Sequence, residues 1–207
     1  MNKTMSALVF SALIALSSAA IADASVSTAT EKDKYYTLVY PVFACDDPDI
    51  QEAINADIYT YARSVADANE GEAYTTGFHY ARMMENERYL SLLFFPIGCY
   101  KGAIHGMYTV GGVVYDKTTG KRLPLSHFAD VTVDDLIRLW EEGEVYSYKG
   151  EKKTVAKLFG PPREVPESYC LTEDGKIFVL FGPYELDCYA GGVTAINVTS
   201  LKKDLPS

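Results

Sequence analysis

The stretch LSLLFFPIGCYKGAIHGMYTVGGVVYD, residues 90–116, decides the fold. An apolar and aromatic run over 90–95 favours a strand, and a second run rich in Val and Tyr follows over 107–115. The motif Pro-Ile-Gly breaks the first run. Two glycines then bracket a short loop over 102–106, because a chain that reverses between strands needs residues that tolerate positive φ. The stretch therefore predicts two strands joined by a loop that carries His105.

Outside this stretch, runs rich in β-branched and aromatic residues predict further strands, and turn signals such as Asp-Gly join them into hairpins. These strands are expected over 35–43, 74–84, 168–172, 176–181 and 193–198. Two helices are also expected. Asp47 caps the first, ahead of an isoleucine-rich stripe, and Thr132 begins the second in a capping box with Asp135. The chain is thus predicted to be an α+β domain, in which an antiparallel sheet of hairpins packs with two helices.

The N-terminus is typical of an export signal. Lys3 precedes an apolar core over 6–16 that is too short to span a bilayer, and small-x-small cleavage motifs follow it. Residues 1–22 are therefore predicted to be a signal peptide, which places the protein in a secreted or periplasmic location, without a membrane span after cleavage. The alternative is a buried N-terminal helix. Residues 23–34 are predicted to be a disordered lead-in, and residues 35–207 a single domain.

The chain is acidic, with 28 Asp and Glu against 19 Lys and Arg and a net charge of −9. Such a surface repels nucleic acid and anionic lipid, so no nucleic-acid partner is expected. It favours a cationic partner through electrostatic steering. The alternative is that acidity only keeps an exported protein soluble.

The chain has four cysteines, and an even count in an exported protein indicates disulfides. Three pairings are possible. We favour Cys99 with Cys188, which leaves Cys45 with Cys170, because Cys99 and Cys188 each lie three residues before a loop glycine. No metal site or cofactor is predicted, since the chain has no close cysteine pair and only three widely spaced histidines.

Catalytic motifs are absent from the sequence. It contains no Gly-x-Ser-x-Gly elbow, no phosphate-binding glycine loop and no His-Glu-x-x-His, and no catalytic residue is assigned. Glu185 and Asp187 could form a glycosidase pair, but the separation such a pair needs is spatial, so their spacing decides nothing. An enzyme acting on cell-wall polymers is therefore kept as an alternative.

Tyrosine is abundant, with sixteen in the chain. Several gather in two glycine-rich loops, around 102–106 and 182–192, where large amphipathic rings suit recognition of a protein or a sugar. The alternative is that strands simply favour tyrosine. The loop imidazole of His105 either contacts the ligand or hydrogen-bonds a neighbouring carbonyl to hold the turn. The candidate ligand-binding residues are Tyr100, His105, Tyr184, Glu185 and Tyr189.

Several short motifs occur in an order that suggests a family. They are Tyr-Pro-Val at 40–42, Ile-Asn at 54–55, LSLLF at 90–94 leading to Gly-Ala-x-His-Gly, YDKTTGK at 115–121 with Leu-Ser at 125–126, LTEDG at 171–175, and Pro-Tyr-Glu with Tyr-Ala-Gly at 183–191. Their order, over about 35–201, resembles the extracellular domain of RsiV-type anti-sigma factors, which is also attached to some peptidoglycan deacetylases and is often described as a domain of unknown function. Two positions depart from the pattern: Ile104 interrupts Gly-Ala-His-Gly, and Cys188 replaces a usual proline.

The resemblance implies an extracytoplasmic recognition domain. In RsiV-type sensors this domain binds lysozyme, which is strongly cationic and suits an acidic partner. Because the chain lacks their transmembrane helix and sigma-binding segment, binding without signalling is expected. The sequence therefore predicts an exported binding domain that recognises a cell-envelope partner, with lysozyme as the leading candidate and the domain acting as inhibitor or decoy. The alternatives are a module that binds peptidoglycan or another glycan, and an enzyme on wall polymers.

Overall fold

A computed structural model describes residues 25–68 and 74–204 of the chain. The predicted signal peptide lies outside these residues. Within them, no helix is long and apolar enough to cross a membrane.

The larger of two sheets has seven strands, and its order is β1-β2-β3-β4-β6-β7, with β5 paired to β4. The strands are β1 (Val26–Lys32), β2 (Tyr36–Phe43), β3 (Tyr74–Glu85), β4 (Tyr89–Tyr100), β5 (Met107–Tyr108), β6 (Gly111–Asp116) and β7 (Arg122–Leu123). All neighbours are antiparallel except β2 and β3. Those two run parallel because helix α1 (Pro48–Asp67) forms the crossover between them.

The smaller sheet has four antiparallel strands in the order β8-β11-β10-β9. They are β8 (Val145–Ser147), β9 (Tyr169–Leu171), β10 (Ile177–Phe181) and β11 (Thr194–Asn197). The other helical elements are α2 (Leu125–Phe128), α3 (Val133–Glu141) and the 3₁₀ turns η1 (Val155–Lys157), η2 (Tyr189–Gly191) and η3 (Thr199–Leu201).

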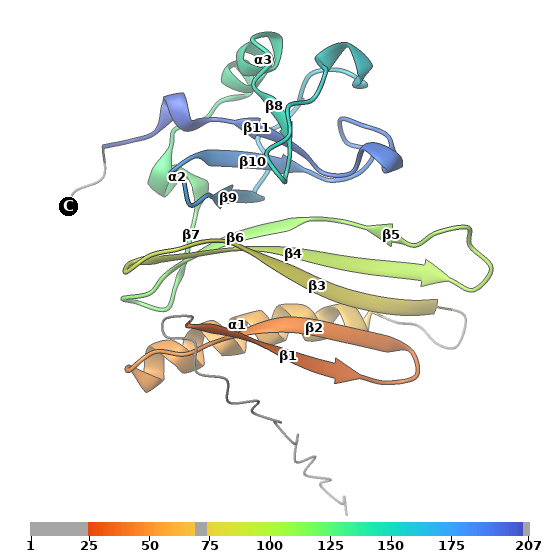
Figure 1. Cartoon of the computed structure of the whole chain (residues 1–207), viewed down its shortest axis with the longest axis vertical. Helices are drawn as coiled ribbons and strands as arrows, with labels where there is room; N and C mark the ends of the chain where they lie inside the picture. Colours follow the sequence, from red (N-terminus) through yellow and green to blue (C-terminus); the bar gives the residue numbers. More distant parts are fainter. Residues whose placement is uncertain (1–24, 69–73, 205–207) are drawn as a thin grey trace, which may run out of the picture.

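The elements stack in layers (Figure 1). Helix α1 covers one face of the larger sheet, the smaller sheet covers the other face, and α3 lies beyond the smaller sheet. Strand β4 serves both interfaces because its side chains alternate between faces. Leu92 and Phe94 pack with α1, whereas Leu93 packs towards the smaller sheet. The sheets approach each other closely at Gly112, where an added Cβ would lie 2.1 Å from the carbonyl oxygen of Tyr169.

The predicted α+β class is confirmed, as are the two helix starts. The Asp47 side chain accepts hydrogen bonds from two backbone amides at the start of α1, and Thr132 forms the capping box with Asp135 at the start of α3. The sheet is more complex than predicted, since it contains one parallel pair and a second sheet packs on it. The structure also adds the short helix α2.

Two local predictions are wrong. The predicted disordered lead-in contains β1, an edge strand that pairs along its whole length with β2. An edge strand needs few apolar side chains, so its Ser- and Thr-rich composition does not prevent pairing. The predicted break at Pro96 is also absent, because β4 continues to Tyr100. Pairing between β4 and β6 ends at Phe94, so the missing amide hydrogen of Pro96 removes no bond from that ladder.

Candidate functional site

The two glycine-rich loops lie together at one end of the molecule. The rings of His105 and Tyr189 are stacked, with centroids 4.0 Å apart and planes inclined by 23°. The Tyr189 hydroxyl donates a 2.6 Å hydrogen bond to the carbonyl oxygen of Gly106. The imidazole Nδ1 of His105 lies 3.0 Å from the same oxygen, so the predicted contact with a neighbouring carbonyl is present. We call residues 100–107 and 182–192 the two-loop rim.

Aromatic rings continue across the two-loop rim and reach solvent. Tyr108 meets Tyr189 edge-on at 5.5 Å, and Tyr184 lies 6.0 Å from Tyr189. Tyr100 is 67% exposed and Tyr184 50% exposed. Ile104, which interrupts the Gly-Ala-His-Gly pattern, is fully exposed. Large apolar side chains in solvent on one surface are the usual mark of an interaction site.

Tyr184 has an unusual backbone. Its φ of 70° makes it the one non-glycine residue with positive φ in residues 25–68 and 74–204. Its amide donates a 2.8 Å hydrogen bond to the carbonyl of Asp187, which closes the turn. A bulky residue in this conformation stores strain, and such residues cluster at binding and catalytic sites.

An ion pair between Lys153 and Asp187 anchors the second loop to the smaller sheet. The ammonium of Lys153 donates to the Asp187 carboxylate at 2.8 Å, to the Gly191 carbonyl at 2.8 Å and to the Thr194 hydroxyl at 2.9 Å. Burial acts to raise the pKa of Asp187, but the hydrogen bonds from Lys153 and from the Cys188 amide outweigh it and hold that pKa below its usual value. Lys153 belongs to the connection between β8 and β9 and lies far in sequence from the loop that it holds.

All five predicted ligand-binding residues lie in the two-loop rim, but they do not all share one surface feature. His105, Tyr184 and Tyr189 belong to one ring cluster, whereas the ring of Tyr100 contacts Tyr74 edge-on, with centroids 4.6 Å apart. Glu185 is exposed and lines a separate hollow of about 490 Å³ that contains Phe159 and Arg163. Asp187 points at Lys153 instead. Glu185 and Asp187 therefore do not face a common cleft as a glycosidase pair must.

The expected disulfides are not formed, and all four cysteines are free thiols. Cys170 is buried on β9 between the two sheets, whereas Cys45 packs on the α1 side of the larger sheet, which separates them. Burial raises the pKa of the Cys170 thiol to about 12. Cys99 is half-buried at the end of β4, and Cys188 is exposed in the second loop, without a bond between them.

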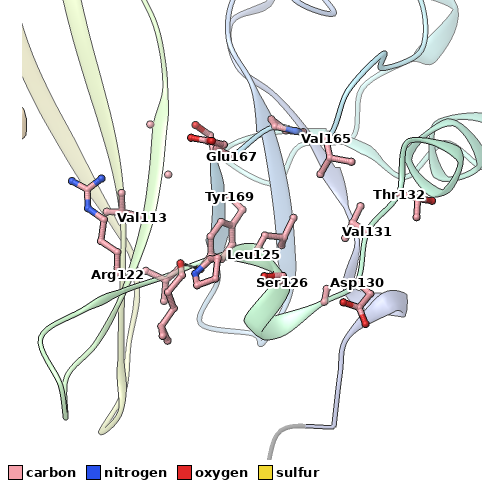
Figure 2. Close-up of a pocket in the computed structure, with 18 of the residues that line it drawn as sticks. Val113, Arg122, Leu125, Ser126, Asp130, Val131, Thr132, Val165, Glu167 and Tyr169 are labelled. Carbon is pink, nitrogen blue, oxygen red and sulfur yellow. Dashed lines mark hydrogen bonds between the residues drawn. The ribbon is translucent and has the colours of Figure 1, made fainter.

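A second concave site, which sequence reasoning missed, lies at the far edge of the larger sheet (Figure 2). This edge groove has a volume of about 880 Å³. Its walls are residues 111–114, 122–126, 129–132 and 165–169, together with Tyr61 from α1. None of these residues belongs to the two-loop rim. The adjacent glycines at 111 and 112 are the sole local signal of it in the sequence.

Arg122 is held in place at one side of the edge groove. Its Nε lies 2.5 Å from the Asp57 carboxylate, and its guanidinium lies 5.7 Å from the centre of the Tyr61 ring. The buried Tyr115 hydroxyl donates to the same carboxylate at 2.6 Å. Burial, followed by the bond to Asp57, raises the pKa of Tyr115, which therefore stays protonated as a donor. The guanidinium is thus oriented before any ligand arrives.

Comparisons with known proteins show a similar fold among solved structures. No protein-family model matches the chain, and no curated protein matches it. Among solved structures, a member of the DUF3298 family from Bacteroides fragilis matches with a TM-score of 0.54 and 14% identity, over 86% of this chain and 92% of that one. A DUF3298 family protein from Pseudomonas aeruginosa matches with a TM-score of 0.52 and 12% identity, over 86% and 92% of the two chains. The chain therefore shares the fold of DUF3298 structures, a domain class without an assigned role.

Proposed function

We propose that the protein is an exported, extracytoplasmic binding domain whose two-loop rim recognises a cationic protein of the cell envelope, with lysozyme as the leading candidate. The observation that carries the proposal is the fastening of the two loops by His105 and Tyr189. Two segments far apart in the sequence thereby form one surface. Its other large side chains, such as Tyr100 and Tyr184, remain free to meet a partner.

Preorganisation supports a binding role. The stack between the loops and the ion pair between Lys153 and Asp187 fix the rim before a partner arrives. Less conformational entropy is then lost on association. Exposed tyrosines suit this use because each offers a large contact area for the loss of only two side-chain torsions. Binding hot spots are enriched in such residues.

Charge supports a cationic partner. The net charge of −9 speeds the approach of a basic protein and disfavours acidic ones. Lysozyme itself is suggested by the resemblance of the sequence motifs to the RsiV-type extracellular domain. An inhibitor or decoy role follows in this proposal, since occupation of the enzyme by the rim competes with its substrate.

The test is a binding titration of the protein with cationic lysozyme at roughly 20 and 150 mM salt, since screening weakens steering between exposed charges. Tyr184→Ala and Tyr100→Ala are each expected to weaken binding roughly tenfold, the effect of a moderate hot spot. Tyr59→Ala is the matched control, because Tyr59 is 42% exposed but lies on α1, on the other side of the larger sheet.

A lack of lysozyme binding at both salt concentrations contradicts the proposal. Retention on purified cell walls without any effect on lysozyme activity points instead to the glycan-binding alternative. Equal binding by the Tyr59 and Tyr184 variants removes the two-loop rim as the contact surface, even if lysozyme binds.

A further inference from the structure

The edge groove contains an unpaired length of sheet edge. Strand β6 pairs with β4 along its whole length, but β7 covers only Val114 and Tyr115 on its other side. Beyond them, Pro124 leaves the ladder and α2 begins at Leu125. The chain therefore turns away just before it would reach the position opposite Gly112.

The hydrogen-bond register shows that the backbone of Gly112 points into the edge groove. The amide of Asp116 donates to Lys121, on the β7 side, and the carbonyl of Val110 accepts from the Ser168 hydroxyl on the same side. Backbone groups alternate in direction along a strand, so those of Gly112 also point to this side. The backbone groups of its neighbour on β4, Leu93, point to β3 instead. The amide of Thr76 on β3 bonds to Tyr35, away from β4, so it is the odd-numbered residues of β3 that direct their backbone groups to β4.

The amide and carbonyl of Gly112 thus have no backbone partner within residues 25–68 and 74–204. An unpaired donor and acceptor on one residue of a sheet edge form the template to which an extended peptide adds. The template is short, because β7 closes it on one side and Ser168 closes it on the other.

The walls of the edge groove match the side-chain alternation of such a peptide. A residue opposite Gly112 would direct its side chain to the face where the sheets meet. That side of the groove is apolar, and Leu125, Val131 and Val165 line it (Figure 2). Its two neighbours would direct their side chains to the other face, towards Tyr61 and Arg122.

The charges at the edge groove indicate which side chain is favoured in the peptide residues next to the one opposite Gly112. The Nε of Arg122 is engaged by Asp57, but its side chain is 39% exposed, so the guanidinium keeps a face for a second carboxylate. Two acidic residues, Asp130 and Glu167, lie on the opposite wall in solvent, and Asp130 pairs with Lys203 at 2.6 Å. A ligand carboxylate is therefore complementary to the Arg122 side of the groove.

We propose that the edge groove is a peptide-binding site, in which an extended segment forms a β-bridge with Gly112, places an apolar side chain between the sheets and places an adjacent acidic side chain at Arg122. This site is separate from the two-loop rim and does not depend on the function proposed for it. The ligand class is a short apolar–acidic peptide.

The test is an NMR titration of the ¹⁵N-labelled protein with the peptide acetyl-Glu-Leu-Glu-amide, in which leucine is placed opposite Gly112 in an antiparallel bridge and a glutamate flanks it on both sides. The Gly112 amide resonance is expected to shift. The same peptide with an N-methyl group on leucine is expected to bind at least about fivefold more weakly, because it cannot donate to the Gly112 carbonyl. Acetyl-Lys-Leu-Lys-amide tests the charge preference without altering the protein.

Arg122→Gln is expected to weaken binding roughly tenfold, the size of one charge-assisted hydrogen bond. Arg88→Gln is the control, because Arg88 is similarly exposed, at 45%, and lies outside the groove. If the Arg122 variant loses spectral dispersion, the lysine peptide carries the same comparison. The proposal is overturned by an unmoved Gly112 resonance, by equal binding of the N-methyl or lysine peptide, or by a preference for an N-acetylglucosamine trimer.

Discussion

The two-loop rim and the edge groove are built in opposite ways. In the rim, side chains hold side chains: the ring of His105 stacks on Tyr189, and Lys153 holds Asp187. In the edge groove, the backbone makes the site, because Gly112 lacks a strand partner on the side away from β4 and the sheets approach too closely there for any side chain. The comparison teaches that a surface made of side chains leaves a signal in composition, whereas a site made by a missing strand leaves almost none.

The largest effect is expected from Gly112→Ala. The added Cβ would lie 2.1 Å from the Tyr169 carbonyl oxygen, and backbone atoms of β9 cannot move without separating the sheets. We expect a loss of about 3 kcal/mol in the free energy of unfolding. Gly111→Ala is the matched control, since its Cβ would meet the Tyr61 hydroxyl at 2.9 Å, and the end of a side chain can move. Urea unfolding measures both. Equal stability of the two variants contradicts a backbone-limited groove.

A smaller loss is expected from Lys153→Met. The change leaves the Asp187 carboxylate, which is 13% exposed, without its cation. Removing one partner of a largely buried pair is destabilising, and we expect about 2 kcal/mol because the loop can partly hydrate. Lys152→Met is the control, because Lys152 is exposed and lies over the Tyr146 ring at 5.9 Å. Chemical denaturation of both variants decides whether Lys153 holds the second loop.

Tyr189→Phe should have a still smaller effect, which separates the stack from the hydrogen bond. The ring stays on His105, but the bond to the Gly106 carbonyl is lost, and we expect about 1 kcal/mol. Hydrogen exchange at the Gly191 and Gly192 amides reports the effect locally, since both bond within the second loop. Unchanged exchange indicates that stacking alone joins the loops.

Local signals explain which parts of the fold were predictable. The caps at Asp47 and Thr132 act within three residues, so both helices could be predicted from the sequence. The glycine-rich loops were found through their aromatic residues. Strand β1 was missed because it is held by backbone pairing and by the 2.6 Å contact between Glu31 and Arg63, which are distant in sequence. The disulfide prediction was wrong because spacing to loop glycines does not determine which cysteines share a layer.

Long-range contacts explain what could not be predicted at either site. Nothing near Lys153 indicates that its ammonium reaches three acceptors around the second loop. The edge groove depends on Pro124, where the chain turns away from β6. The residue of β6 that is left unpaired can be identified only once the register of the sheet is known. A Gly-Gly pair within a strand marks a close backbone approach but not its partner.

The smallest expected effect is a pH dependence that tests how the second loop is held. The pKa of Asp187 is lower in the folded chain than its ordinary value. Its carboxylate therefore contributes stability above the unfolded pKa, and this contribution is lost as the pH falls through the lower folded pKa. Other carboxylates titrate in the same range, so the informative quantity is the difference in unfolding free energy between the wild type and Lys153→Met. Without Lys153, no cation offsets the burial of Asp187, so protonation of Asp187 costs the variant less stability than it costs the wild type. Denaturation at pH values between about 6 and 3 should therefore show the difference shrinking towards acid. A constant difference would mean that Lys153 stabilises the loop through its bonds to Gly191 and Thr194 rather than through the carboxylate.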